Sequence, residues 1–363
     1  MVRRNLTSLA GTLAIAIVMV GACSAGGSTT ASPGGGASPA APVATPVAAT
    51  ATPVAATATP AVSAATTTAA PEGRIAFGVR ANDTSQIFSV LPDGTDSRQL
   101  TTGAGNHLCA AYAADGSRIA YCADSSGAFE IWTMKPDGST PAQLTHLRGK
   151  ALFPDFSRDG KKVAFGGVEG DAPNTEIYTV DGATGEGLVA LTSCAGLKPG
   201  CSNDYPAWSP DDRSIVFIHT DDYDANDRPI NSQVWVMDAD GSHPHALTTD
   251  RLAKDQVPDW SPDGSLIAYA AGPIDASEGI WVMNADGSKP HQVSGCTSDE
   301  PAPCKAGNDF GPEWSPDGSA IAFLRAFQAV GSADRPIFTM DADGGNQVRV
   351  SQGTILAAVP AWQ

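Results

Sequence analysis

The fold is decided by the stretch Pro258-Asp259-Trp260-Ser261-Pro262-Asp263-Gly264-Ser265-Leu266-Ile267-Ala268-Tyr269. A second segment follows it, Ile280-Trp281-Val282-Met283-Asn284-Ala285-Asp286-Gly287, and the unit closes with His291-Gln292-Val293-Ser294. Most of the chain after residue 72 repeats this unit. The aromatic residue of the first segment recurs at spacings of 44 to 54 residues, at Tyr112, Phe156, Trp208, Trp260, Trp314 and Trp362. A period in this range indicates a repeat architecture.

Each unit is predicted to form four short strands. The first strand ends at the aromatic residue, and Ser-Pro-Asp-Gly then predicts a tight turn, since Pro presets φ and Gly accepts positive φ. Residues 266–269 and 280–283 form the second and third strands, and Ala285-Asp286-Gly287 turns the chain into a fourth. The third strand is apolar on both faces, which predicts burial on both. The density of Gly and Pro argues against helices.

Four-stranded sheets that each pack face to face between two neighbours make a β-propeller. We therefore predict an all-β fold, a six-bladed β-propeller of four-stranded blades. The folded domain opens at Gly73 with a second strand, whereas Val359-Pro360-Ala361-Trp362 is a first strand without a successor. Pairing of these N- and C-terminal strands would close the ring and hide its edges. A sandwich is the alternative, although it does not require near-identical repeats.

The repeated segments resemble a known family. Trp-Ser-Pro-Asp-Gly-x-x-Ile-Ala-Phe followed by Ile-Trp-Val-Met-x-Ala-Asp-Gly is similar to the TolB-type, WD40-like propeller repeat, and the resemblance runs from Gly73 to Trp362. It implies that the first strands line a central channel. The same repeat occurs in periplasmic scaffold proteins, peptidase propeller domains and some polysaccharide lyases, so it implies fold more than function. One turn carries Asp212 where Gly is usual, and Asp tolerates positive φ well enough to keep the turn.

The N-terminal 72 residues are expected to lie outside the folded domain. Residues 1–22 are predicted to be a lipoprotein signal peptide, since two arginines precede an apolar run too short to span a bilayer comfortably. The sequence ending at Cys23 resembles a bacterial lipobox, which implies lipidation of Cys23. An ordinary signal peptide is the alternative. Residues 23–72, rich in Ala, Pro and Thr, are predicted to be a disordered linker, and residues 73–363 the propeller. The protein is thus expected to be exported and lipid-anchored to a bacterial membrane.

The net charge of −17 argues against a nucleic-acid partner. Many of the acidic residues are turn aspartates, which contribute solubility. The densest acidic run, residues 221–227, lacks the Gly and Glu that a calcium loop requires. We therefore expect no metal and no cofactor.

Six cysteines remain after Cys23, and in an exported chain they suggest three local disulfides. Two pairs each fall within one connection before a first strand. The third pair flanks the Asp115-Gly116 turn symmetrically, so a two-residue hairpin would place its members opposite each other and a three-residue loop would offset them. The expected pairs are Cys194–Cys201, Cys296–Cys304 and Cys109–Cys122.

No catalytic constellation is recognisable. The chain has no Gly-x-Ser-x-Gly nucleophile elbow. A lyase-like metal site would need several histidines at equivalent inner positions, whereas most of the six lie elsewhere in the repeat. The histidines are His107, His146, His219, His243, His245 and His291. We predict a protein that is not an enzyme, with a glycan-acting propeller enzyme that uses an unrecognised metal site as the alternative.

A binding role remains, and polar residues recur where the first strands begin. They are Asn106, His107, Asp204, Asp255, Asn308 and Asp309. They could form a ring at the channel mouth that takes a peptide, sugar or cation, or they could simply begin strands in a water-filled channel. We expect a monomeric, membrane-tethered binding or scaffold module of the cell envelope. Its partner, an envelope protein or peptide or a glycan, would dock on the channel face that carries the cysteine loops.

Overall fold

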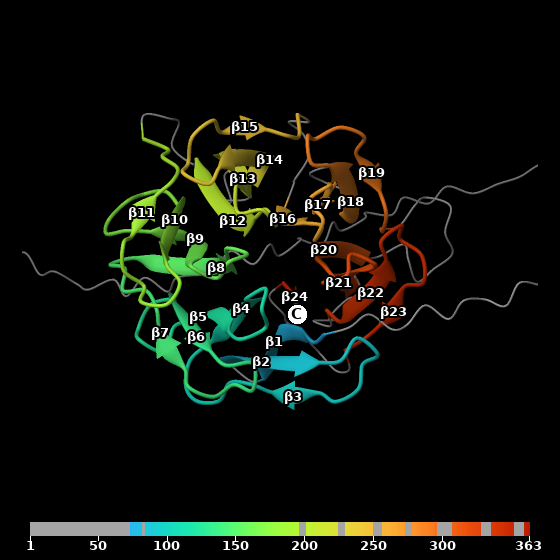
Figure 1. Ribbon diagram of the computed structural model, residues 1–363, viewed down its shortest axis with the longest axis horizontal. Coiled ribbons are helices and arrows are strands. Elements are labelled where there is room, and N and C mark those ends of the chain that lie inside the picture. Colours follow the sequence, from blue (N-terminus) through green and yellow to red (C-terminus); the bar gives the residue numbers. More distant parts are fainter. Residues whose placement is uncertain are drawn as a thin grey trace, which may run out of the picture. The chain divides into compact units, whose positions relative to one another are not determined.

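The protein, described here by a computed structural model, forms six four-stranded antiparallel sheets arranged around a centre (Figure 1). The structure describes residues 73–81, 84–195, 201–223, 229–249, 256–272, 278–295, 307–327, 335–351 and 359–363. All regular elements in these ranges are strands. In these ranges, no helix is long and apolar enough to cross a membrane. The predicted six-bladed propeller of four-stranded blades is confirmed.

Each blade contributes one strand to the centre and one to the rim (Figure 1). The inner strands of blades 1 to 6 are β24 (Ala361–Trp362), β4 (His107–Tyr112), β8 (Lys150–Phe156), β12 (Ser202–Trp208), β16 (Gln256–Trp260) and β20 (Gly307–Trp314). The second strands, in the same order, are β1 (Ile75–Ala81), β5 (Ile119–Ala123), β9 (Lys162–Val168), β13 (Ser214–Tyr223), β17 (Leu266–Ala271) and β21 (Ala320–Phe327).

The third strands are β2 (Thr84–Val90), β6 (Glu130–Met134), β10 (Glu176–Asp181), β14 (Pro229–Asp238), β18 (Gly279–Asn284) and β22 (Ile337–Asp341). The outer strands are β3 (Arg98–Gln99), β7 (Ala142–Gln143), β11 (Val189–Ala190), β15 (His245–Ala246), β19 (His291–Gln292) and β23 (Val348–Arg349). Each outer strand has only two residues, which leaves little edge for pairing with another chain.

The ring closes through the two ends of the folded domain. The C-terminal strand β24 pairs with β1, with Ile75 opposite Trp362 and Ala76 opposite Ala361. Blade 1 is therefore the composite blade that the repeats predict. The closing contact also has its own core, because Trp362 packs with residues of β21 from blade 6.

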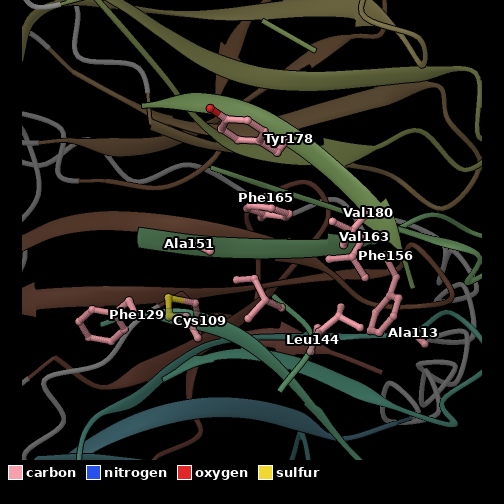
Figure 2. Packing of buried hydrophobic residues seen from close by; sticks show 13 residues of the cluster. Cys109, Ala113, Phe129, Leu144, Ala151, Phe156, Val163, Phe165, Tyr178 and Val180 are labelled. Carbon is pink, nitrogen blue, oxygen red and sulfur yellow. A yellow bond between two sulfur atoms is a disulfide. The ribbon is translucent and has the colours of Figure 1, made fainter. Parts of the chain in front are cut away.

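The apolar core is divided into six clusters, one at each interface between neighbouring blades. Figure 2 shows the cluster between blades 2 and 3, where Phe129 and Leu144 face Phe156 and Phe165. The third strand supplies both sides of its blade: in β18, Ile280 and Met283 are almost fully buried but belong to different clusters. This is why the third strands show no alternation of polar and apolar residues.

The turn in blade 4 keeps its shape although Asp212 replaces the usual glycine. Asp212 has a φ of 59°, close to the 72° of Gly264 in blade 5. Its backbone N still donates to Ser209 O at 3.0 Å. Its carboxylate also accepts hydrogen bonds from the backbone N of Arg158 and of Asp159, the latter at 3.1 Å. Asp212 therefore joins the turns of blades 3 and 4, which offsets the strain of positive φ.

Candidate functional site

The inner strands share a backbone irregularity halfway along the channel. Five of them contain a β-bulge at the same place, at which one residue takes positive φ. These residues are Cys109, Phe153, Tyr205, Val257 and Gly311, with φ between 47° and 62°. Only one is glycine, and positive φ is a genuine outlier for a β-branched valine. Such strain persists where the surrounding structure imposes it, and it is concentrated at functional sites.

At the bulges, the side chains that line the channel are mostly apolar. Phe153 and Tyr205 stack with ring centroids 3.9 Å apart, and both are partly exposed, as is Val257. They line a cavity of about 80 Å³ together with the prolines that follow the positive-φ residues. A proline cannot donate to the ladder, so it suits this unpaired position.

Below the apolar mouth lies a group of three carboxyl side chains, Asp155, Asp259 and Glu313, which we call the waist. Each immediately precedes the aromatic residue of its inner strand, where the other three blades carry alanine. All three line the mouth cavity and also a second cavity of about 150 Å³ toward the Ser-Pro-Asp-Gly turns. The waist therefore separates two chambers of one channel.

Each waist carboxyl holds the next blade. Asp155 Oδ2 accepts a hydrogen bond from Trp208 N at 2.7 Å, and Asp259 Oδ2 accepts one from Trp314 N at 2.8 Å. Glu313 Oε1 accepts from the N of Trp362 in the closing strand, at 3.4 Å.

Burial dominates the electrostatics of the waist. It raises the pKa of Asp155 and of Asp259 to about 7, and the charge of Asp259 contributes to the rise at Asp155. Burial, followed by the charges of Asp259 and Asp155, raises the pKa of Glu313 well above its usual value. Like charges that share a site cannot all ionise readily. The waist is thus a poised acidic group that would gain from a cationic neighbour.

The larger chamber is ringed by the repeat's aromatic residues. Its wall includes the exposed Arg158 and, at the far end of the chain, Gln363. The aromatic residues that line it are Tyr112, Phe156, Trp208, Trp260 and Trp314, together with Trp362. Five of them are buried between blades and Trp260 is half-buried, so their main role is packing.

Of the polar residues expected at the channel mouth, two brace blades 1 and 2. Asn106 Oδ1 accepts from Ser85 N at 3.1 Å, and Asn106 Nδ2 donates to Asp124 at 2.8 Å. His107 is buried, with Nε2 3.3 Å from Ser125 Oγ. Burial lowers the pKa of His107. These side chains are engaged within the ring.

Asn308 and Asp309 play a similar part between blades 5 and 6. Asn308 Oδ1 accepts from Glu278 N at 3.1 Å. Asp309 is 1% exposed and receives two hydrogen bonds from Arg325, each of 2.7 Å, and a third from Ser294 Oγ at 2.8 Å. Its carboxylate is already neutralised, which leaves it little capacity for a ligand.

Asp204 differs from Asp309 because, among the residues that the structure describes, no ion pair neutralises it. Burial raises its pKa to about 7, with Lys150 acting in the opposite direction through its charge. It lies against Gly166 of blade 3, where a Cβ atom would come within 2.7 Å of Asp204 Oδ1. Asp255 lies outside the described residues.

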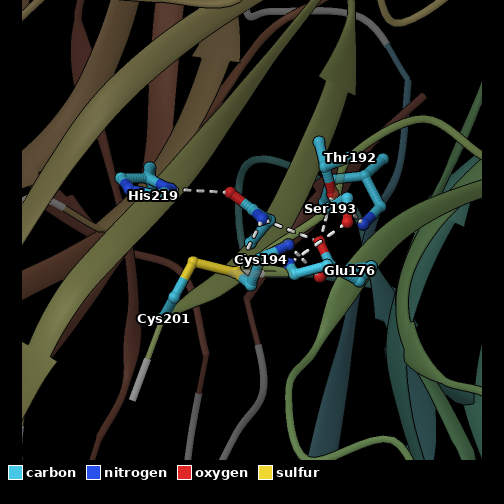
Figure 3. The surroundings of a disulfide bond; sticks show 9 residues. Glu176, Thr192, Ser193, Cys194, Cys201 and His219 are labelled. Carbon is cyan, nitrogen blue, oxygen red and sulfur yellow. Dashed lines mark hydrogen bonds between the residues drawn. A yellow bond between two sulfur atoms is a disulfide. The ribbon is translucent and has the colours of Figure 1, made fainter. Parts of the chain in front are cut away.

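Two disulfides stiffen the mouth side. Cys194–Cys201 closes the connection between blades 3 and 4 (Figure 3). Glu176 anchors it by accepting hydrogen bonds from Cys194 N at 2.5 Å and Asn203 Nδ2 at 2.9 Å. Asn203 Oδ1 in turn contacts His219 Nδ1 at 2.8 Å. A polar network therefore fixes this loop to both blades.

The second disulfide, Cys109–Cys122, joins β4 to β5 at the bulge. Near the turn, Tyr112 pairs with Ile119, a register that would place Cys109 opposite Cys122. The bulge then shifts the register by one residue, so that Leu108 pairs with Cys122. Cys23, Cys296 and Cys304 lie outside the described residues.

The histidines do not gather at the centre. His243 and His245 lie at the exposed outer turn and strand of blade 4, and His291 lies in the outer strand of blade 5. Among the described residues, no three His, Cys, Asp or Glu side chains are grouped in a way that could hold a metal ion.

A closed ring of six blades, with its strained backbone and acidic residues gathered on the axis, defines a β-propeller whose candidate site is the central channel. A model of the TolB beta propeller domain matches residues 50–225 and 137–303, which together cover more than half of the chain. The protein belongs to this family. No curated protein matches the sequence.

Solved structures show the same fold. TolB from Acinetobacter baumannii superposes with a TM-score of 0.62 at 21% identity, covering 80% of this chain and 66% of that chain, just under two thirds of its length. A putative TolB from Agrobacterium tumefaciens gives 0.57 at 19% identity, covering 77% and 89%. A chain of a nidogen/laminin complex gives 0.60 at 11% identity, covering 80% and 98%. The last of these shows how widely the fold is used, so function must be argued from the site.

Proposed function

We propose that this protein is a non-catalytic binding module of the bacterial cell envelope that captures a protein partner in its central channel. The observation that supports this best is the acidic waist reached through an apolar mouth. A peptide segment with apolar residues and a lysine or arginine fits this arrangement. Its side chain could reach Asp155 and Asp259 while its apolar neighbours pack on Phe153, Tyr205 and Val257.

The tether is the second part of the proposal. Lipidation of Cys23 followed by the linker to residue 72 would hold the propeller near a membrane while leaving the channel accessible. The two disulfides agree with an oxidising compartment and hence with export. Mass spectrometry of the mature N-terminus tests this part: we expect a diacylated Cys23, and an unmodified Cys23 or cleavage elsewhere would refute the anchor.

The channel can be tested by site-directed photo-crosslinking in the full chain, in native membranes. A photoreactive phenylalanine analogue replaces Tyr205 at the mouth or, as the control, Val348, which is 52% exposed on the outer strand of blade 6. We expect one partner to crosslink through position 205 and not through 348. Crosslinking through 348 alone would place the interface on the rim and contradict the channel site.

The affinity of the crosslinked partner then tests the waist. A hydrogen bond to a charged group contributes about 1.5–3 kcal/mol, and about 1.4 kcal/mol corresponds to a factor of ten in Kd. We therefore expect Asp155→Asn to weaken binding about tenfold or more. The matched control is Asp137→Asn, at an exposed turn of blade 2. Equal affinities for the two variants would contradict the proposal.

A further inference from the structure

The three waist carboxyls link blades as well as line the channel. Asp155 joins blade 3 to blade 4, Asp259 joins blade 5 to blade 6, and Glu313 joins blade 6 to the closing strand of blade 1. Three of the six blade interfaces, including the closure, therefore carry a titratable side chain hydrogen-bonded to the backbone N of the next blade's tryptophan.

The charged groups around the waist are mostly acidic. The charges of Asp259 and Asp212 raise the pKa of Asp155, and the charges of Asp259 and Asp155 raise the pKa of Glu313. In the part of the chain that the structure describes, Arg158 is the only Lys or Arg that lines either chamber, and its side chain is exposed. Because so little positive charge offsets them, three carboxylates from three blades repel one another across a narrow space.

We propose that the waist is a proton-operated clamp on the ring: Asp155, Asp259 and Glu313 hold their neighbouring blades while protons limit their charge, and they loosen those contacts as they lose their protons and charge accumulates. The protonated carboxyl keeps a carbonyl oxygen that accepts the same backbone N–H. Ionisation strengthens each acceptor but adds repulsion and draws water to the waist.

The raised pKa values of Asp155 and Asp259, both about 7, place the ionisation of these two carboxyls near neutral pH, and Glu313 ionises well above its usual range. The closure is the weakest of the three links, because β24 pairs with β1 through only two residue pairs and the Glu313 bond is the longest. Loosening is therefore expected first at Trp362. This inference does not depend on any ligand, so it stands or fails separately from the proposed function.

Amide hydrogen exchange, measured by NMR on the full chain at pH 5 and pH 8, tests the clamp. Protection factors, which correct for the intrinsic pH dependence of exchange, are compared for the amides of Trp208, Trp314 and Trp362. The reference amides are those of Ile87 and Ile337, which donate to the neutral hydroxyls of Thr101 and Ser351. We expect at least a tenfold fall at the three tryptophans between pH 5 and pH 8, and a smaller change at the references.

Variants separate ionisation from packing. The triple variant D155N/D259N/E313Q keeps a side-chain carbonyl at each position but cannot ionise, so its three tryptophan amides should lose their pH dependence. The variant D137N/D240N/D286N, with changes at exposed turns, should behave like the wild type. If the triple variant does not fold, E313Q alone decides, because it should remove the effect at Trp362 and weaken it at Trp208. Parallel changes at all five wild-type amides, or an unaltered effect in either waist variant, would overturn the clamp.

Discussion

At the scale of single residues, the polar side chains where the inner strands begin hold the ring together. Asp309 shows this best, because its carboxylate bonds both to Arg325 of its own blade and to Ser294 of blade 5. A buried ion pair adds little net stability when intact, but removing one partner strands the other charge.

Replacing Asp309 by Ala should therefore cost about 3–5 kcal/mol of unfolding free energy. Urea denaturation checks this, with Asp286→Ala at an exposed turn as the control. If both variants unfold at the wild-type urea concentration, Asp309 does not brace the blades and is available for a ligand after all.

Asp204 predicts a pH dependence of stability. Its folded pKa of about 7 lies above the ordinary value of 3.8 because the side chain is buried. The folded protein therefore binds the Asp204 proton more tightly than the unfolded chain does. The stability from this proton is complete below about pH 4, falls as the pH rises toward 7, and changes little above pH 7.

Asp204→Asn should remove this dependence. Between pH 4 and pH 7, the wild type should lose up to about 1.4 kcal/mol of unfolding free energy per pH unit relative to Asp204→Asn. Chemical denaturation across this range provides the measurement. A difference that stays constant with pH would mean that Asp204 has an ordinary pKa in the folded protein.

At the scale of elements, a hydroxyl clamp fastens the outer strand of every blade. The Thr or Ser that follows each outer strand accepts a hydrogen bond from the backbone N of a buried third-strand residue. The pairs are Thr101–Ile87, Thr145–Ile131, Thr192–Ile177, Thr248–Val234, Ser294–Ile280 and Ser351–Ile337. This hydrogen bond explains why the units end in Gln-Leu-Thr or a close variant.

Thr101→Val preserves the shape of this residue but removes the acceptor. The buried Ile87 N and Gln86 Oε1 would both lose a partner, at a cost of about 1–3 kcal/mol for each unsatisfied group. The matched control is Thr95→Val in an exposed turn. Equal thermal stability of the two variants would show that the hydroxyl hydrogen bond of Thr101 is dispensable.

At the scale of the whole molecule, closure is what makes the ring one cooperative unit. Trp362 is 5% exposed and packs in the cluster that joins blades 6 and 1. Without the closing strand β24, blade 1 would have no inner strand, and β1 would expose an unpaired edge to the channel.

Trp362→Ala should lower stability by at least roughly 3 kcal/mol, the worth of burying a large aromatic side chain, and Gln363→Ala should have little effect. Differential scanning calorimetry provides the test. A melting temperature for Trp362→Ala equal to that of the wild type would mean that the ring does not depend on this closure.

The repeats were sufficient to predict the propeller, the composite blade and the turn at Asp212. Each of these depends on local signals: the period of the aromatic residues, the Pro-Asp-Gly turns and a pair of incomplete end units. The waist was missed, although acids recur before the aromatic residue at Asp155, Asp259 and Glu313 in place of alanine. In one unit such an acid cannot be told from any other strand residue, so the sequence alone indicates only the polar residues where the strands begin.

By itself, the sequence determined that this chain folds as six β blades and which strand closes them, because hydrophobic period and turn chemistry act over short distances along the chain. Only the tertiary structure decided which polar groups meet. Ring closure brings Asp155, Asp259 and Glu313 together on the axis, and inter-blade packing engages Asp309 with Arg325 and Ser294. Desolvation and charge repulsion depend on distance in space, and residues one or two repeats apart become neighbours only when the blades form a ring.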